Sequence, residues 1–259
     1  MRLGNKVLTL RVFDRRRKGE LQLEIWDEGV AHLLCTDNRI EAAPAHRVGS
    51  FVDYLSGSSA RDIEKTMSLI QPERFSDHVA GESYAVLEWP WGDSSVRFPL
   101  SQPPGEIGDL VRKLRRVFDD IARAPLAAFE ISAEGGRGKV TRWSEPPLSF
   151  TLTNVGKSAF HVDPEPDVIA ELELEGNGER WTTEAKCDGR NRDLFSQFVL
   201  PPGQRMIIFP TGLYLPVPDR YRVSGAVLLK MRCSEIPGSD SNRWHQLWAS
   251  FPSVTMDAE

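Results

Sequence analysis

Cysteine is scarce in this chain and is not arranged as a disulfide framework. The 259 residues contain three cysteines, which are widely spaced and odd in number: Cys35, Cys187 and Cys233. Small secreted domains that depend on disulfides have a denser and usually even set of cysteines. We therefore expect reduced thiols and a cytoplasmic location.

Long apolar segments are also absent from the sequence. No stretch reaches the roughly 18 apolar residues that a membrane helix requires. Near the N-terminus, charge returns at Arg11 before an apolar core of signal-peptide length is complete. We expect a soluble protein with no membrane partner.

Positive charge is not in excess, since the formal net charge is −5 and the sequence pI is about 5.7. Nucleic-acid phosphates select basic surfaces. The two basic clusters, at residues 15–18 and 112–116, are explained by a hairpin turn and by the polar face of a helix. The sequence therefore predicts no nucleic-acid partner.

Motifs that would carry catalysis or hold a cofactor are missing as well. The stretch LSGSSARD (55–62) lacks the second glycine of a G-x-S-x-G nucleophile elbow. In EGGRGKVT (134–141), Val140 stands where a phosphate-binding loop needs Ser or Thr. The histidines are scattered, and no two cysteines have metal-ligand spacing. We expect no metal and no cofactor, and the balance favours a protein that is not an enzyme.

The first half of the chain begins with strand-like alternation of apolar and polar residues. It occurs at 6–13, 21–26 and 30–35, with turn residues between. This pattern predicts a three-stranded antiparallel meander, and residues 83–100 predict a hairpin.

Helical spacing of apolar residues follows the predicted meander. A short helix is predicted from four residues at i, i+3, i+4 and i+7: Val48, Phe51, Val52 and Leu55. A second helix is expected after Ser59, and the clearest one at 106–123, where a single apolar stripe ends before Pro125. These patterns predict an α+β domain, an antiparallel sheet with helices on one face.

From Leu126 onward, no segment has a convincing helical period. Seven short strand-like segments, separated by turns rich in glycine and proline, cover residues 127–132, 148–155, 168–175, 180–186, 204–209, 221–231 and 245–251. Short strands with such turns are typical of a β-sandwich.

Two stretches of this half resemble the late strands of immunoglobulin-like domains, namely VLPPGQRMIIF (199–209) and VPDRYRVSG (217–225). Tyr221 begins a strand after a Pro-Asp turn, where the tyrosine corner of that fold would be. Val223 stands where antibody domains have their second cysteine, so no inter-sheet disulfide is implied. The resemblance implies an all-β, immunoglobulin-like sandwich and no particular activity.

The change of pattern near Ala124 gives the predicted domain organisation. We expect an α+β domain over residues 1–124, followed by an immunoglobulin-like β-sandwich domain over residues 125–259. The connection is too short for a flexible tether, so the two domains should touch.

The best candidates for binding anchors lie at the tip of the predicted hairpin. Trp89 and Trp91 flank Pro90, and Asp93 belongs to the turn itself. Tryptophan is over-represented among binding hot spots. We therefore predict that Trp89, Trp91 and Asp93 contact a ligand.

These observations favour a non-catalytic cytoplasmic module that binds a partner protein. An accessory or antidote (immunity-type) protein that binds and neutralises its partner is one form of this hypothesis. One alternative is an enzyme with a site assembled in the cleft between the domains, for which the candidates are His32, Asp37, His161 and Asp163. Another is a carbohydrate-binding protein that stacks sugars on the hairpin tryptophans.

Overall fold

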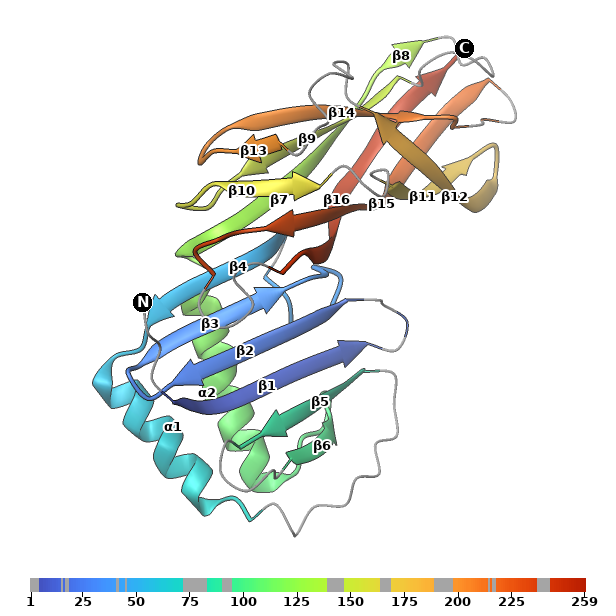
Figure 1. The fold of residues 1–259 in the computed structure, drawn as a ribbon. Helices are drawn as coiled ribbons and strands as arrows, with labels where there is room; N and C mark the ends of the chain where they lie inside the picture. The colour runs from blue at the N-terminus through green and yellow to red at the C-terminus, as the bar shows by residue number, and fades with distance from the viewer. Residues whose placement is uncertain are drawn as a thin grey trace.

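The computed structural model describes residues 5–14, 16, 19–40, 42–44, 46–71, 83–89, 95–138, 147–163, 169–188, 198–213, 215, 218–236 and 243–259. Most of these residues are in β-strands, which lie in one 16-stranded sheet (Figure 1). The β-rich character inferred from the second half of the sequence is therefore correct.

The first part of the sheet is built on the predicted meander. β1 (Lys6–Asp14), β2 (Glu20–Trp26) and β3 (Val30–Cys35) pair antiparallel in chain order, which confirms that prediction. β4 (Arg47–Tyr54) pairs with β3. On the other side, β5 (Ser83–Glu88) pairs with β1, and β6 (Ser95–Pro99) pairs with β5.

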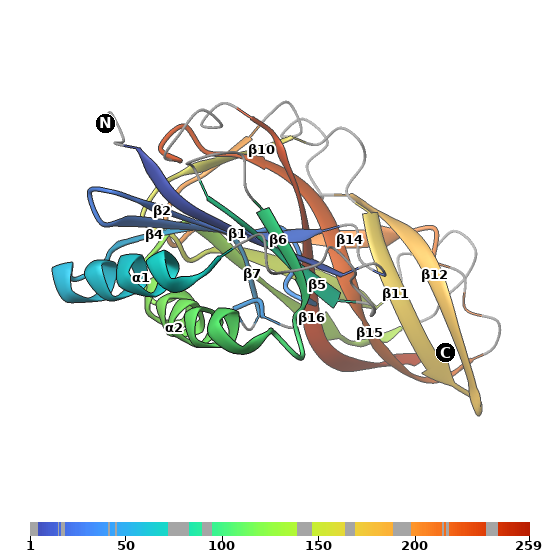
Figure 2. The ribbon, with the colours of Figure 1, turned by 90° about the horizontal axis from the view of Figure 1, so that it is seen from below.

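Two helices occur in the described part of the chain, and they lie side by side (Figure 2). α1 (Gly57–Leu69) begins after Ser56, whose hydroxyl accepts a hydrogen bond from the backbone N–H of Ser59. α2 (Gly105–Ile121) lies against β3 and β4 with a buried apolar stripe that includes Ile107, Leu110 and Leu114.

The remaining strands continue the same sheet. Their bounds are β7 (Pro125–Gly135), β8 (Arg137–Gly138), β9 (Leu148–Asn154), β10 (Phe160–Asp163), β11 (Ile169–Gly176), β12 (Glu179–Asp188), β13 (Phe198–Leu200), β14 (Arg205–Thr211), β15 (Asp219–Arg232) and β16 (His245–Ala258). β7 pairs with β4 on one side and with β9 on the other. Among the described pairs of strands, only β8 with β16 is parallel.

The predicted fold class is wrong. An α+β domain with helices on an antiparallel sheet, followed by an immunoglobulin-like sandwich, would have a separate sheet in each half. Instead, β7 follows α2 immediately and pairs with β4, so hydrogen-bonded strands run from one half to the other within one mixed sheet. The immunoglobulin-like assignment has no support, and the division at residues 124 and 125 stays a prediction.

The helix predicted at residues 48–55 is also wrong, because this segment belongs to β4. Val48, Ser50 and Phe51 are all buried, and because neighbouring residues of a strand point to opposite faces, both faces of β4 are covered here; α2 and β16 both contact this strand. A strand buried on both faces does not show a period of two. Its apolar residues therefore fell by coincidence at helical spacing.

Aromatic contacts join two layers of the sheet in its second part. The ring of Phe129 on β7 lies 5.7 Å from that of Phe160 on β10, and Phe150 on β9 lies 5.0 Å from Phe251 on β16. These side chains are buried and form the core between the layers. Within the described part of the chain, no helix has the length and apolar character needed to cross a membrane.

Candidate functional site

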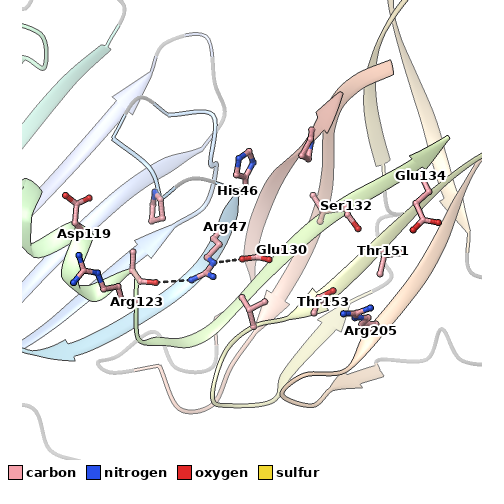
Figure 3. A pocket seen from close by; sticks show the side chains of 15 residues that line it. His46, Arg47, Asp119, Arg123, Glu130, Ser132, Glu134, Thr151, Thr153 and Arg205 are labelled. Carbon is pink, nitrogen blue, oxygen red and sulfur yellow. Dashed lines mark hydrogen bonds and ion pairs between the residues drawn. The ribbon is translucent and has the colours of Figure 1, made fainter. Parts of the chain in front are cut away.

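An open groove of about 910 Å³ runs beside the C-terminal end of α2 and across β4, β7, β9 and β14 (Figure 3). Its polar lining includes His46, Arg47, Glu130, Thr153 and Arg205, together with Asp119 from the last turn of α2 and Arg123 just after the helix. No phenylalanine, tyrosine or tryptophan is among its described lining residues.

One row of side chains crosses the floor of this groove. Arg47 on β4 lies opposite Glu130 on β7. Glu130 lies in turn opposite Thr153 on β9, and Thr153 lies opposite Arg205 on β14. Neighbouring strands are about 4.8 Å apart, so the row extends about 14 Å and has an arginine at each end.

The row is held on a rigid support. The opposite face of the same strands is in the core, where Phe129 and Leu152 are 0% exposed and Ile131 is 3% exposed. Because these strands are hydrogen-bonded to one another and packed on that face, the polar row is positioned before any ligand arrives.

Ion pairing differs between the two ends of the row. The Nε atom of Arg47 lies 2.5 Å from Oε1 of Glu130, and its Nη1 atom donates a hydrogen bond of 3.2 Å to the carbonyl of Ala122 at the end of α2 (Figure 3). Arg205 is exposed and makes no ion pair with any residue that the structure describes. The positive charge is thus neutralised at the β4 end and available at the β14 end.

His46, at the rim of the groove, has a backbone φ of +61°. Residues other than glycine rarely adopt this left-handed conformation, although histidine does so more often than most. Strained backbone of this kind tends to occur at binding sites, which supports the groove as the functional surface.

His32, a sequence candidate, lies in a buried polar network on another face of the sheet. Its Nε2 atom is 2.8 Å from Oγ of Ser50, and its Nδ1 atom is 3.7 Å from Oε2 of Glu24. Lys6 pairs with the second oxygen of Glu24, and the Nε2 atom of Gln22 donates to it at 2.9 Å. Ser50, His32 and Glu24 are thus arranged in the order of a hydrolase triad.

The position of Ser50 nevertheless argues against nucleophilic catalysis. Its side chain is 0% exposed, and it lies in the middle of β4, opposite Leu34 on β3 and Ala127 on β7. Because Ser50 is fully buried and lies between two paired strands, with a register irregularity between Ser50 and Phe51 on the β7 side, its hydroxyl is not open to a substrate. We interpret the network as structural, with each polar group satisfied by its neighbour.

The carboxyl group of Glu24 has a perturbed pKa. Burial alone would raise it, but the close contacts with His32 and Lys6 and their charges outweigh burial and lower the pKa of Glu24 to about 2. This network therefore keeps Glu24 ionised inside the protein.

Asp37 lies in a different network, which we call the clasp: residues 36–40 together with Glu171, Trp248 and Ser250. The carboxylate of Asp37 is 0% exposed and accepts hydrogen bonds of 2.9 and 2.7 Å from the side chain of Arg39 and of 2.9 Å from its backbone N–H. The guanidinium group of Arg39 lies 5.1 Å from the ring centroid of Trp248 on β16. Its Nη1 atom is 3.4 Å from Oε2 of Glu171 on β11.

Backbone hydrogen bonds complete the clasp. The N–H of Trp248 donates to the carbonyl of Thr36 at 2.7 Å. The side-chain oxygen of Asn38 accepts hydrogen bonds of 2.8 Å from both the backbone N–H and the hydroxyl of Ser250. The clasp attaches the connection between β3 and β4 to the second part of the sheet.

His161 makes no described contact with these networks, and the side chain of Asp163 lies outside the described part of the structure. His161 lies on β10 opposite Val199 and Arg232, and Asp163 follows on the same strand. No described side-chain contact links His32, Asp37 and His161 to one another. No group of three metal-ligating side chains is found in the described ranges.

Of the predicted hairpin anchors, Trp89 is 8% exposed and packs in the hydrophobic core. Trp91 and Asp93 lie outside the described residues. The three cysteines are buried and unpaired with one another, and burial raises the pKa of each thiol, to about 12 for Cys187.

Sequence reasoning missed the groove. Its residues come from six separate segments, and each alone has the appearance of an ordinary solvated strand or helix end. Only the strand register brings them into one row, and no short motif encodes that register. The alternation in 148–155 was the one available signal, since its apolar residues are buried and Thr151 and Thr153 lie on the other face of the strand.

No family model matches the chain, and no curated protein matches it either. Among solved structures, it is similar to the thioester domain of the Enterococcus faecium TIE86 protein, at 8% identity and a TM-score of 0.18, over 99% of this chain and 98% of that one. A TM-score this low carries no argument about fold or function.

Proposed function

We propose that this chain is a non-catalytic module that binds a partner protein in the groove between the end of α2 and β14. The observation that carries the proposal is the row of Arg47, Glu130, Thr153 and Arg205, held on a rigid support and open to solvent. Arginine is enriched among interface hot spots, and a preorganised surface loses less entropy on binding.

The character of the groove favours a polypeptide over a small ligand. Small-molecule sites are usually enclosed and largely apolar, with aromatic residues in the lining. This groove is open, its lining carries both signs of charge, and none of its described lining residues is the phenylalanine, tyrosine or tryptophan on which sugars usually stack. A protein segment with polar side chains satisfies such a surface best.

A role as an accessory or antidote protein is one form of this function. The buried, unpaired thiols support our expectation of a reducing, cytoplasmic environment for it. The acidic net charge suits a partner whose surface is basic overall.

Site-specific photocrosslinking in the source cell tests the proposal. A photoreactive amino acid in place of Thr153 should trap one discrete partner protein, and this adduct should disappear in the Arg205→Glu background. The matched control places the same group at Thr182, which is exposed on β12 and lies opposite Glu173 of β11, outside the part of β12 that pairs with β14. The proposal fails if positions 153 and 182 give the same products, or if the purified chain turns over a small molecule unaided.

A further inference from the structure

The end of the groove at β14 differs from the rest of it in two ways. Arg205 has no ion pair with any described residue, whereas Arg47 is already neutralised by Glu130. Ile207, two residues after Arg205, is 53% exposed. Among the described residues, three other large hydrophobic side chains are exposed, and none of them lines the groove or neighbours its polar row: Tyr54 at the opposite end of β4 from Arg47, Leu69 and Val199.

Ile207 belongs to the same surface as the polar row. It lies opposite Thr151 on β9, which lines the groove, and next to the row that contains Thr153 and Arg205. Residues two apart on a strand point to the same face and are separated by about 6.7 Å along it. Arg205 and Ile207 therefore present a positive charge and an apolar side chain side by side.

We infer that this end of the groove binds an extended segment of the partner protein in which an acidic residue and an apolar residue are two positions apart. The inference rests on the proposed function and names the chemistry of its partner. The acidic side chain pairs with Arg205, and the apolar side chain covers Ile207.

Two physical arguments support this occupant. A carboxylate beside Arg205 forms charge-assisted hydrogen bonds, which are stronger than neutral ones and, with arginine, are frequently bidentate. An extended chain repeats its side chains on one face with the same spacing of about 6.7 Å as β14 itself. One segment can thus engage both residues without distortion.

Selection from a random 12-residue peptide library displayed on phage tests the inference, with the full chain immobilised. We expect enrichment of sequences with Asp or Glu two positions from an apolar residue. The same selection on Arg205→Glu should enrich Lys or Arg in place of the acidic residue. A labelled peptide from the first selection should bind Arg205→Glu at least ~10-fold and Ile207→Ser ~5-fold more weakly than the native chain.

The matched control is Arg180→Glu, a reversal of the same charge at an exposed arginine on β12. It should bind the labelled peptide with unchanged affinity. Circular dichroism and urea denaturation establish that each variant is folded.

The outcomes separate the inference from the proposed function. If no peptide is enriched, or if peptides bind Arg205→Glu and Ile207→Ser as well as the native chain, the inference is overturned. A discrete crosslinked partner at position 153 would then still support binding in the groove. If neither a crosslinked partner nor an enriched peptide is found, the inference and the proposed function both fail.

Discussion

At the scale of single residues, the buried network around Glu24 makes stability depend on pH. Its carboxyl pKa is lowered from an ordinary 4.5 to about 2 in the folded protein. A carboxyl group whose pKa is lower in the folded than in the unfolded state stabilises the protein at pH values above its unfolded-state pKa. This stabilisation is lost as the pH falls from about 4.5 to about 2. A difference of this size corresponds to about 3 kcal/mol.

We therefore predict that Glu24→Gln is about 3 kcal/mol less stable than the native chain at pH 7 and that the difference shrinks toward zero near pH 2. Urea denaturation at several pH values measures it. The control is Glu64→Gln, at an exposed position on α1, which should leave the free energy of unfolding unchanged. A difference that stays constant with pH would contradict the proposed ionisation.

Arg39 stabilises the clasp by neutralising a carboxylate that has no access to solvent. Burial alone would lower the pKa of the Arg39 guanidinium, but hydrogen bonds and charges from Asp37 and then Glu171 raise it. Removal of one partner of a buried ion pair leaves the other charge uncompensated, which typically destabilises a protein by about 3–5 kcal/mol.

We predict a loss of about 3 kcal/mol or more in the free energy of unfolding for Arg39→Met. The double variant Arg39→Met/Asp37→Asn should recover part of it, because the unpaired charge is then absent. Arg112→Met is the control, since its ion pair with Asp109 is exposed and contributes little. If the double variant is no more stable than Arg39→Met, the charge is not the cause.

At the scale of elements, sequence patterns succeeded where one face of a strand or helix is solvated. The alternation in β1, β2, β9 and β11 and the apolar stripe of α2 located those elements. They failed for β4, because a strand covered on both faces shows no alternation. The groove could not be predicted for a related reason, since the register between β4, β7, β9 and β14 depends on packing across the whole sheet.

Close packing of β4 against β7 also explains a glycine. Gly49 has a φ of +129°, and an added Cβ would lie 2.3 Å from the carbonyl oxygen of Ala127. Neither the backbone conformation nor the space tolerates a side chain there. Gly49 thus permits the strand pairing that makes the sheet continuous.

We predict that Gly49→Ala lowers the free energy of unfolding by about 3 kcal/mol, because strain and overlap with backbone cannot be relieved by a rotamer change. Thermal and urea denaturation measure the change. Gly57→Ala, in the first turn of α1 with nothing within 4 Å of the added Cβ, is the matched control. It should leave stability unchanged or increase it by less than about 1 kcal/mol. Equal effects of both substitutions would show that the contact with Ala127 is not decisive.

At the scale of the whole molecule, two sets of contacts connect the first part of the chain, up to α2, with the second part, from β7 onward. The sheet is continuous through the pairing of β4 with β7, and the clasp attaches residues 36–40 to β11 and β16. Chains longer than about 150 residues often unfold in several steps. Here we expect the two parts to unfold together, because the unfolding of either part would break both the pairing of β4 with β7 and the clasp.

The buried thiols provide a test of this coupling. Cys35 on β3 and Cys233 after β15 are both 0% exposed, and burial raises the pKa of both, so each reacts only when its surroundings open. We predict that native-state labelling with iodoacetamide, mapped by mass spectrometry across a urea series, gives the same opening free energy at both cysteines. Arg39→Met should lower both values together. Labelling of Cys233 at urea concentrations that leave Cys35 protected would show instead that the two parts open independently, and the continuous sheet would then not act as one cooperative unit.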